Sequence, residues 1–271
     1  MARTTLHRAD RVSAILETLS ANGSVNVAQL SREFGVSAAT LRRDLQMLEE
    51  QHLLSRTHGG AVAQDVAYEL PVRYRSGQQR TQKQQIARAV VSRIPHEQLV
   101  VGLTGGTTTS EVSRLLADRA NLTIVTNALN IAAELALRPR LKLVVTGGVA
   151  RPQSYELVGP WAERTLASVT IGVAVVGVDG ITAQDGLTTH DEVEAHTNHV
   201  LISRARRVVV AADGSKVGRA LLARMAPIED VHELVTDHTA DPEAIDAIRA
   251  AGVRVTFADD VAAEHLDHAT P

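Results

Sequence analysis

The sequence predicts an α/β protein in two parts: a small helical N-terminal unit with a β-hairpin, and a larger unit built on a parallel sheet. Three observations support this. Over the first 50 residues, apolar residues recur every three or four positions, which is the period of an amphipathic helix. From residue 99 onward, short apolar runs alternate with helical stretches, as in strands buried in a parallel sheet. A polar, glutamine-rich segment separates the two patterns.

The first 62 residues predict three short helices and a hairpin, and each helix carries its apolar residues on one face. Asn26 is the expected N-cap of the second helix, which ends at Gly35, and Ser37 is the expected N-cap of the third. In the hairpin, Gly59 and Gly60 can adopt the positive φ angles of a tight turn. The apolar stripes are Val12, Ile15, Leu16 and Leu19, then Val27, Leu30 and Phe34, then Leu41, Leu45 and Leu48.

The rest of the chain predicts a doubly wound, Rossmann-like parallel sheet, because its strands are apolar throughout and separated by helices. We expect a helix at 81–94, strands at 99–103, 122–126, 142–146, 171–177, 208–212, 232–236 and 253–257, and helices near 107–116, 128–137, 191–205 and 242–251. The expected domain boundaries are 1–62 for the first unit, 63–80 for a linker, 81–258 for the second unit and 259–271 for a tail.

Composition excludes several classes of protein. The 271 residues are 44% hydrophobic and 22% charged, as in globular chains, and include no cysteine, so disulfides and thiolate sites are excluded. No secretory signal and no apolar run of about 20 residues is visible, so we expect a cytoplasmic protein with no membrane partner. Aromatic residues make up only 2%, which argues against a stacking platform for single-stranded nucleic acid.

The formal net charge of −3 argues against a nucleic-acid partner only while it is treated as an average. Residues 1–83 hold 11 basic and 8 acidic residues, or +3, whereas residues 84–271 hold 17 basic and 23 acidic residues, or −6. A basic first unit on an acidic second unit fits a chain that grips nucleic acid with the first unit alone. A unit of only +3 also suggests that tight binding depends on pairing two such units.

Two short helices joined by a Gly-Val-Ser turn, preceded by a helix and followed by a hairpin, predict a winged helix-turn-helix. In the third helix the leucines lie on one side and polar residues lie opposite. Arginine and glutamine can read guanine and adenine in the major groove, while hydroxyls and a helix N-terminus bind phosphates. We expect Asp44 to pair with an arginine rather than face DNA. The predicted DNA-binding residues are Ser37, Ala39, Thr40, Arg42, Arg43 and Gln46, with Arg56, His58 and Gly59 in the wing.

Residues 36–62 resemble the DeoR/GlpR family of bacterial transcriptional regulators. The family hallmark combines a serine, a Thr-aliphatic-Arg-Arg-Asp-Leu run and a terminal His-Gly-Gly. Ser37, residues 40–45 and residues 58–60 match it one by one.

Small polar residues follow five of the expected strands, and the carboxyl ends of parallel strands line a ligand crevice. The run TGGTTTSEV at 104–112 leads into a helix, whose free N–H groups and dipole suit a phosphate. It lacks the lysine of a P-loop, and a plain structural turn is the alternative. Lys216 would add a positive charge, while Asp179 and Asp213 would bind hydroxyls or cap turns. The predicted effector-binding residues are Gly105, Gly106, Thr107, Thr108, Thr109, Thr126, Asn127, Gly147, Gly148, Asp179, Gly180, Asp213 and Lys216.

These segments, in the same order, are similar to the sensor domain of that family, whose fold resembles ribose-5-phosphate isomerase and CoA-transferases. The resemblance covers nearly the whole chain and implies a phosphorylated sugar or sugar acid as effector. Many members have Asp and Ser where this chain has Thr104 and Gly105, so the resemblance does not identify the sugar. Secondary candidates for the crevice, for which a structural role is the alternative, are Tyr155, Glu156, Gly159 and Glu194.

We therefore expect a regulator that binds double-stranded operator DNA as a homo-oligomer, most simply a repressor of a carbohydrate-catabolism operon released by a sugar phosphate. Whether the effector weakens or strengthens operator binding stays open, because the same coupling between the two sites could favour DNA binding. The alternatives are a sugar-phosphate isomerase-like enzyme and a DNA-bound architectural protein. We expect no cofactor or resident metal. His190, His196 and His199 lie close together in the sequence and could bind zinc in principle. No further ligand from a remote part of the chain is evident, so a solvated helix face is favoured.

Overall fold

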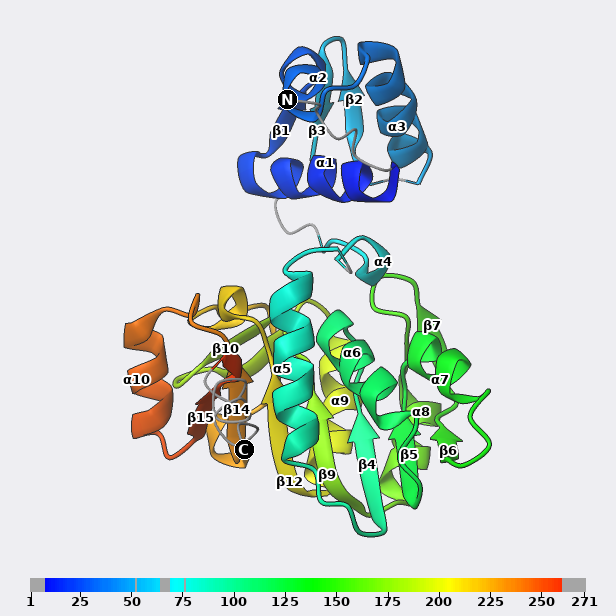
Figure 1. Cartoon of the computed structure of the whole chain (residues 1–271), viewed down its shortest axis with the longest axis vertical. Coiled ribbons are helices and arrows are strands. Elements are labelled where there is room, and N and C mark those ends of the chain that lie inside the picture. The colour runs from blue at the N-terminus through cyan, green and yellow to red at the C-terminus, as the bar shows by residue number, and fades with distance from the viewer. Residues whose placement is uncertain (1–7, 52, 64–68, 76, 260–271) are drawn as a thin grey trace, which may run out of the picture. The chain divides into compact units, whose positions relative to one another are not determined.

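The computed structural model describes residues 8–51, 53–63, 69–75 and 77–259 (Figure 1). The chain divides into two compact units, Met1–Gln78 and Gln79–Pro271. No helix in the described ranges is long and apolar enough to cross a membrane. Residues 64–68 of the predicted linker and residues 260–271 of the predicted tail lie outside the described residues.

The first unit is a winged helix-turn-helix, as the sequence predicts. Its short strands form an antiparallel sheet in the order β1-β3-β2. The three apolar stripes meet in one core, where Ile15, Leu41 and Leu45 are at most 1% exposed. The elements are α1 (Arg8–Asn22), β1 (Ser24–Asn26), α2 (Val27–Phe34), α3 (Ala38–Glu50), β2 (Ser55–Thr57), β3 (Gly60–Val62) and α4 (Val72–Arg75).

Local sequence signals set the helix ends in this unit. The side chains of Asn26 and Ser37 cap α2 and α3 by accepting hydrogen bonds from backbone N–H groups of the first turn. Gly35 ends α2 in the left-handed conformation at φ 66°. Gly60 is required for packing, because a Cβ there would lie 1.8 Å from the carbonyl oxygen of Val25.

Two features of this unit are not predicted from the sequence. Residues 24–26 form β1, which pairs with β3 and extends the hairpin to three strands. The predicted linker contains α4, and Leu70 and Tyr74 pack against the core of this unit. The Tyr74 hydroxyl donates to Gln51 Oε1 at 2.5 Å. The first unit therefore continues to about residue 78 rather than ending at residue 62.

The second unit is a doubly wound α/β domain, in agreement with the predicted fold class. Its central sheet has the order β15-β14-β12-β9-β4-β5-β6, and every neighbouring pair is parallel. All seven strands are predicted, although β12 begins before the expected residue 208. The strands are β4 (Leu99–Leu103), β5 (Leu122–Thr126), β6 (Lys142–Val145), β9 (Ile171–Val176), β12 (Ala205–Ala211), β14 (Glu233–Thr236) and β15 (Arg254–Phe257).

Helices cover both faces of this sheet, because its strands are apolar on both sides. On β9, Val173 and Val175 face one hydrophobic cluster, whereas Ala174 and Val176 face the other. The first cluster includes α5 (Arg80–Ser92), α6 (Thr107–Leu116) and α7 (Leu129–Leu135). The second includes α8 (Pro160–Ala167), α9 (Glu192–Ser203) and α10 (Pro242–Ala250).

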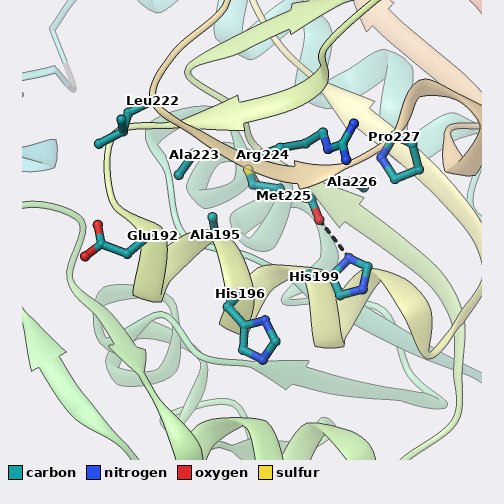
Figure 2. Close-up of a pocket in the computed structure, with 10 residues that line it drawn as sticks. All are labelled: Glu192, Ala195, His196, His199, Leu222, Ala223, Arg224, Met225, Ala226 and Pro227. Carbon is teal, nitrogen blue, oxygen red and sulfur yellow. Dashed lines mark hydrogen bonds between the residues drawn. The ribbon is translucent and has the colours of Figure 1, made fainter.

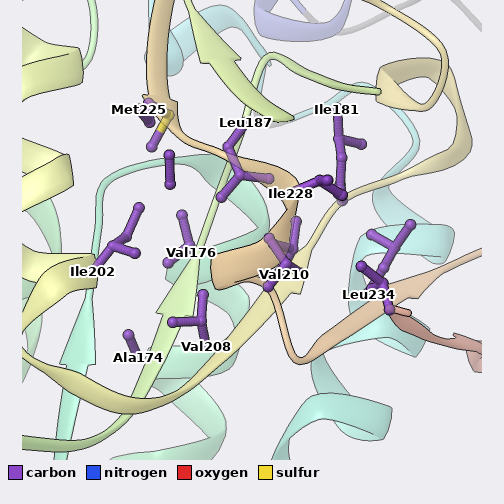
Figure 3. Packing of buried hydrophobic residues seen from close by; sticks show 14 of the residues in the cluster. Ala174, Val176, Ile181, Leu187, Ile202, Val208, Val210, Met225, Ile228 and Leu234 are labelled. Carbon is purple, nitrogen blue, oxygen red and sulfur yellow. The ribbon is translucent and has the colours of Figure 1, made fainter. Parts of the chain in front are cut away.

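Several short strands of the second unit are not predicted. β7 (Val149–Arg151) and β8 (Glu156–Val158) form an antiparallel pair. A small sheet has the order β10-β11-β13, from β10 (Gly180–Thr182), β11 (Gly186–Thr189) and β13 (Ala223–Ala226). Its Ile181, Leu187 and Met225 join Val176 and Val210 in the second cluster (Figure 3). Two 3-10 turns, Gly214–Lys216 and Ile228–Asp230, follow β12 and β13.

Candidate functional site

The outer face of α3 is polar and carries two exposed arginines. Arg42 and Arg43 are exposed, and within the described part of the chain neither side chain makes a hydrogen bond or an ion pair. Their charges are therefore available to an external anion. Of the other residues predicted on this helix, Ser37, Ala39 and Gln46 are exposed and Thr40 is half-buried. That they contact DNA stays a prediction.

Asp44 faces away from this surface and is 3% exposed. It accepts a hydrogen bond from Arg11 Nε of α1 at 2.6 Å, and Arg8 Nε lies 3.6 Å from its other oxygen. The prediction that Asp44 pairs with an arginine is confirmed. The pair joins α3 to α1 and so helps to fix the orientation of the exposed helix face.

The predicted wing residues Arg56, His58 and Gly59 are exposed on the β2–β3 hairpin. Glu49 of α3 accepts the backbone N–H of Arg56 at 3.0 Å, and its other oxygen lies 3.7 Å from the Arg56 guanidinium. The Gly59 carbonyl accepts the N–H of Val27 at 2.9 Å. The hairpin is thus held against both helices of the helix-turn-helix.

In the second unit, the loops after β4 and β9 meet where the strand order reverses. β5 and β6 continue from β4 on one side, and β9 and β12 lie on the other. The N–H of Gly177 donates to Thr104 Oγ1 at 2.9 Å. A Cβ on Gly177 would lie 2.9 Å from the Gly105 carbonyl oxygen, so the two loops are in close contact. Such a reversal point is where open parallel sheets bind ligands.

The predicted phosphate site is the first turn of α6. Gly106 precedes this helix at φ 127°, a conformation that favours glycine. No described side chain caps the N–H groups of the turn, which suits an anion. Thr107 is half-buried and Thr108 is buried. The Thr109 hydroxyl donates to the Gly106 carbonyl at 3.1 Å, so its proton is already engaged within the turn.

Glu156 of β8 lies against this loop and is 2% exposed. Its Oε1 accepts the N–H of Gly105 at 2.5 Å, and its Oε2 accepts Asn198 Nδ2 at 2.9 Å. Burial raises the pKa of Glu156 well above its usual range, and the charge of Glu194 raises it further. Hydrogen bonds to the carboxylate oppose this shift without offsetting it. A carboxyl group therefore occupies one amide of the glycine-rich loop.

A second polar network adjoins Glu156. Thr189 Oγ1 lies 3.1 Å from Asp179 Oδ2 and 2.9 Å from Glu194 Oε1. Arg151 Nη1 donates to Glu194 Oε2 at 3.1 Å, and Lys216 Nζ lies 3.7 Å from Asp179 Oδ1. The structure thus brings the predicted Asp179 and Lys216 together. Carboxylates and cations at this spacing can bind both the hydroxyls and the phosphate of a sugar phosphate.

Asn127, another predicted residue, reaches this polar region. Its Nδ2 donates to Asn198 Oδ1 at 3.1 Å. Its Oδ1 is buried and, like Thr146 Oγ1, has no hydrogen-bond partner in the described structure. An unsatisfied buried acceptor is costly, so a ligand donor there would be stabilising.

Other predicted crevice residues have structural contacts. Asp213 caps the 3-10 turn by accepting the N–H of Ser215 at 3.2 Å. Of the two roles expected for Asp213, binding a sugar hydroxyl or capping a turn, this contact is the second. Thr126 Oγ1 donates to the Leu103 carbonyl at 2.8 Å. A Cβ on Gly180 would lie 2.4 Å from the Arg219 carbonyl oxygen, so close packing requires this glycine. Gly148 has φ 140° and packs on the backbone of β8, whereas Gly147 is exposed.

Sequence reasoning missed Arg151, Thr189 and Asn198, and it ranked Glu156 and Glu194 second. All five come from elements outside the seven-stranded sheet. The available signal was polar residues on the buried side of α9, where Glu194 and Asn198 are four positions apart and so share a face.

The histidines of α9 are exposed rather than gathered at a metal. His196 is exposed and, in the described residues, no group of three or more His, Asp or Glu is placed to hold a metal ion. His199 Nδ1 donates to the Met225 carbonyl at 2.9 Å.

Known proteins resemble both units. The DeoR-like helix-turn-helix domain matches residues 11–66, and the DeoR C-terminal sensor domain matches residues 78–238. The regulator GlpR of Haloferax volcanii is 35% identical, over 91% of this chain and 96% of its own. The glycerol-3-phosphate regulon repressor of Escherichia coli is 31% identical, over 86% and 92%. A ribose 5-phosphate isomerase A from Methanocaldococcus jannaschii aligns with TM-score 0.37 and 18% identity, over 52% and 53%.

Proposed function

Because the chain belongs to the DeoR family of DNA-binding transcriptional regulators, we propose that it represses a carbohydrate-catabolism operon and is released by a phosphorylated sugar. Membership in this family sets aside the isomerase alternative, since the relatives are regulators. The observation that carries the DNA-binding part is the face of α3, where Arg42 and Arg43 are exposed without described partners and the opposite leucines are buried.

On DNA, the N-terminal half of α3 would enter the major groove. Arg43 and Gln46 are placed to read base edges, because arginine and glutamine form paired hydrogen bonds with guanine and adenine. Ser37, Thr40 and Arg42 would contact phosphates, and Arg56 and His58 would follow the backbone or the minor groove. Paired winged helix-turn-helix units read two half-sites about 34–36 Å apart, so the functional form would be a homo-oligomer. We place this homo-oligomer in the cytoplasm.

In the second unit, the effector phosphate would bind the first turn of α6, beside Gly106 and Thr107, with Lys216 as the second positive group. The sugar hydroxyls would bind Asp179 and Asn127. Glu156 must give up its bond to Gly105 if the phosphate takes that amide. Binding would favour an arrangement of the oligomer with low operator affinity; a coupling of about 1–3 kcal/mol lowers that affinity about 5–150-fold.

The test combines two measurements on the full chain. Genomic DNA fragments selected by the protein are titrated by fluorescence anisotropy, and the protein is screened by thermal shift against sugar phosphates, with the unphosphorylated sugars as controls. Ligand at 100 times its Kd stabilises by about 2.7 kcal/mol. We expect one sugar phosphate to raise Tm and to release the DNA, while its parent sugar does neither. A protein that selects no DNA, or a Tm that responds equally to parent sugars, would refute the proposal.

A further inference from the structure

A groove of about 770 Å³ runs between α9 and β13, apart from the strand ends (Figure 2). Its floor is apolar, with Ala195, Ala223 and Met225 buried. Leu222, which also lines the groove, is 83% exposed. One face of the domain therefore carries both an apolar hollow and a projecting apolar side chain, which is costly to leave in water.

Charged groups of opposite sign line the same groove. Glu192 lies at the start of α9 and Arg224 lies on β13, and both are exposed. Within the described ranges the side chain of neither residue makes a hydrogen bond or an ion pair. Elsewhere in this unit, arginines close to acidic side chains pair with them, as Arg114 does with Glu111 and Glu134. The groove thus presents one unpaired charge of each sign beside an apolar centre.

We propose that this groove binds a second copy of the chain in an isologous dimer, an inference that rests on the oligomeric regulator proposed above. In a two-fold interface the same patch faces itself, so every contact occurs twice. A patch that holds a projection, a hollow and both signs of charge is complementary to itself. Leu222 of each copy enters the groove of the other, and Glu192 pairs with Arg224 across the axis. Apolar burial flanked by paired charges is the usual anatomy of such an interface.

The first experiment measures the mass of the full chain by analytical ultracentrifugation, for the wild type and for Leu222→Glu. Leu137→Glu is the matched control, because Leu137 is 82% exposed but does not line the groove. We expect Leu222→Glu to weaken self-association about 100-fold, since each dimer carries the change twice, and the control to assemble like the wild type. The proposal would be overturned by a wild type that is monomeric or by a Leu222→Glu variant that self-associates like the wild type. It would also be overturned if Leu137→Glu weakened self-association as much as Leu222→Glu.

The second experiment tests the charge pairing by reversal. Arg224→Glu and Glu192→Arg should each weaken self-association about tenfold, and the double variant should recover to within about threefold of the wild type. Neither residue is part of the core, so the fold is checked simply by an unchanged thermal transition. A double variant as weak as the single variants would show that these two groups do not meet.

The outcomes separate this inference from the proposed function. If the wild type selects no DNA but Leu222→Glu dissociates the dimer, the proposed dimer surface is supported and the regulator proposal fails. If the wild type binds operator DNA and Leu222→Glu leaves its mass unchanged, the regulator stands and this surface is wrong.

Discussion

Asp44→Ala should destabilise the DNA-binding unit while leaving the stability of the second unit unchanged. The side chains of Arg11 and Asp44 are 8% and 4% exposed, and their charged atoms lie 2.6 Å apart. Removing the carboxylate leaves the Arg11 charge buried, and breaking a buried pair from one side costs about 3–5 kcal/mol. A unit of about 70 residues has a free energy of unfolding of roughly 4–10 kcal/mol. The variant would therefore lose a large share of this unit's stability.

The assay is urea unfolding of the full chain followed by two signals. Trp161 is the single tryptophan and lies in the second unit, so its fluorescence reports that unit, whereas far-UV circular dichroism reports the helices of both. With a slope of about 1 kcal/mol/M, a loss of 3 kcal/mol moves the midpoint of the first unit down by about 3 M urea. The fluorescence midpoint should not move.

Two further variants sharpen the result. Glu50→Ala removes an exposed carboxylate from the same helix and should change stability by less than about 0.5 kcal/mol. Arg11→Met combined with Asp44→Leu replaces the pair by apolar groups and should recover most of the loss. If Asp44→Ala cost no more than Glu50→Ala, the reasoning about a buried pair would be refuted.

Three other results are expected. Arg43→Ala should weaken operator binding by about 1–3 kcal/mol in anisotropy titrations without changing effector binding, and unchanged affinity would make Arg43 a mere surface residue. Lys216→Ala combined with Thr107→Val should abolish release of DNA by the effector with Tm retained; a normal response would misplace the phosphate site. The raised pKa of Glu156 favours its protonated form in the folded state, so unfolding free energy should fall as pH rises from the usual glutamate pKa through the raised one. Glu156→Gln should lack this decline in urea titrations across that window, and an identical pH profile would contradict the burial argument.

The parts of the fold that depend on local signals could be predicted from the sequence. Asn26 and Ser37 cap helices because their side chains reach amides two or three residues away. The seven strands of the large sheet are short, mainly apolar runs that alternate with helical stretches, which is the pattern of a parallel sheet. The short strands were missed because three or four residues such as Gly180–Thr182 carry too little pattern, and their pairing partners lie far along the chain.

The site divides in the same way. Asp179 and Lys216 were predicted because a parallel sheet puts all strand ends on one edge, whatever the rest of the chain does. Glu156, Arg151 and Asn198 reach the same region from β8, β7 and α9, and nothing in the sequence fixes how those elements pack over the edge. Residues on elements that pack over the edge of the sheet can therefore be assigned to the site only from the structure.

α9 connects the two regions on which the proposals rest. Glu194 and Asn198, on its buried side, bond to Arg151 and Glu156 in the crevice, whereas His196 and Glu192, on its exposed side, line the groove. A ligand that draws Glu156 away from Gly105 breaks or stretches the bond from Asn198, and so shifts the balance of contacts on one side of this helix. Because packed helices move as rigid elements, a shift on that side is also felt in the groove. Leu222→Glu should then weaken operator binding along with self-association, and effector should release less of the DNA that stays bound, while the Tm rise on effector binding is retained.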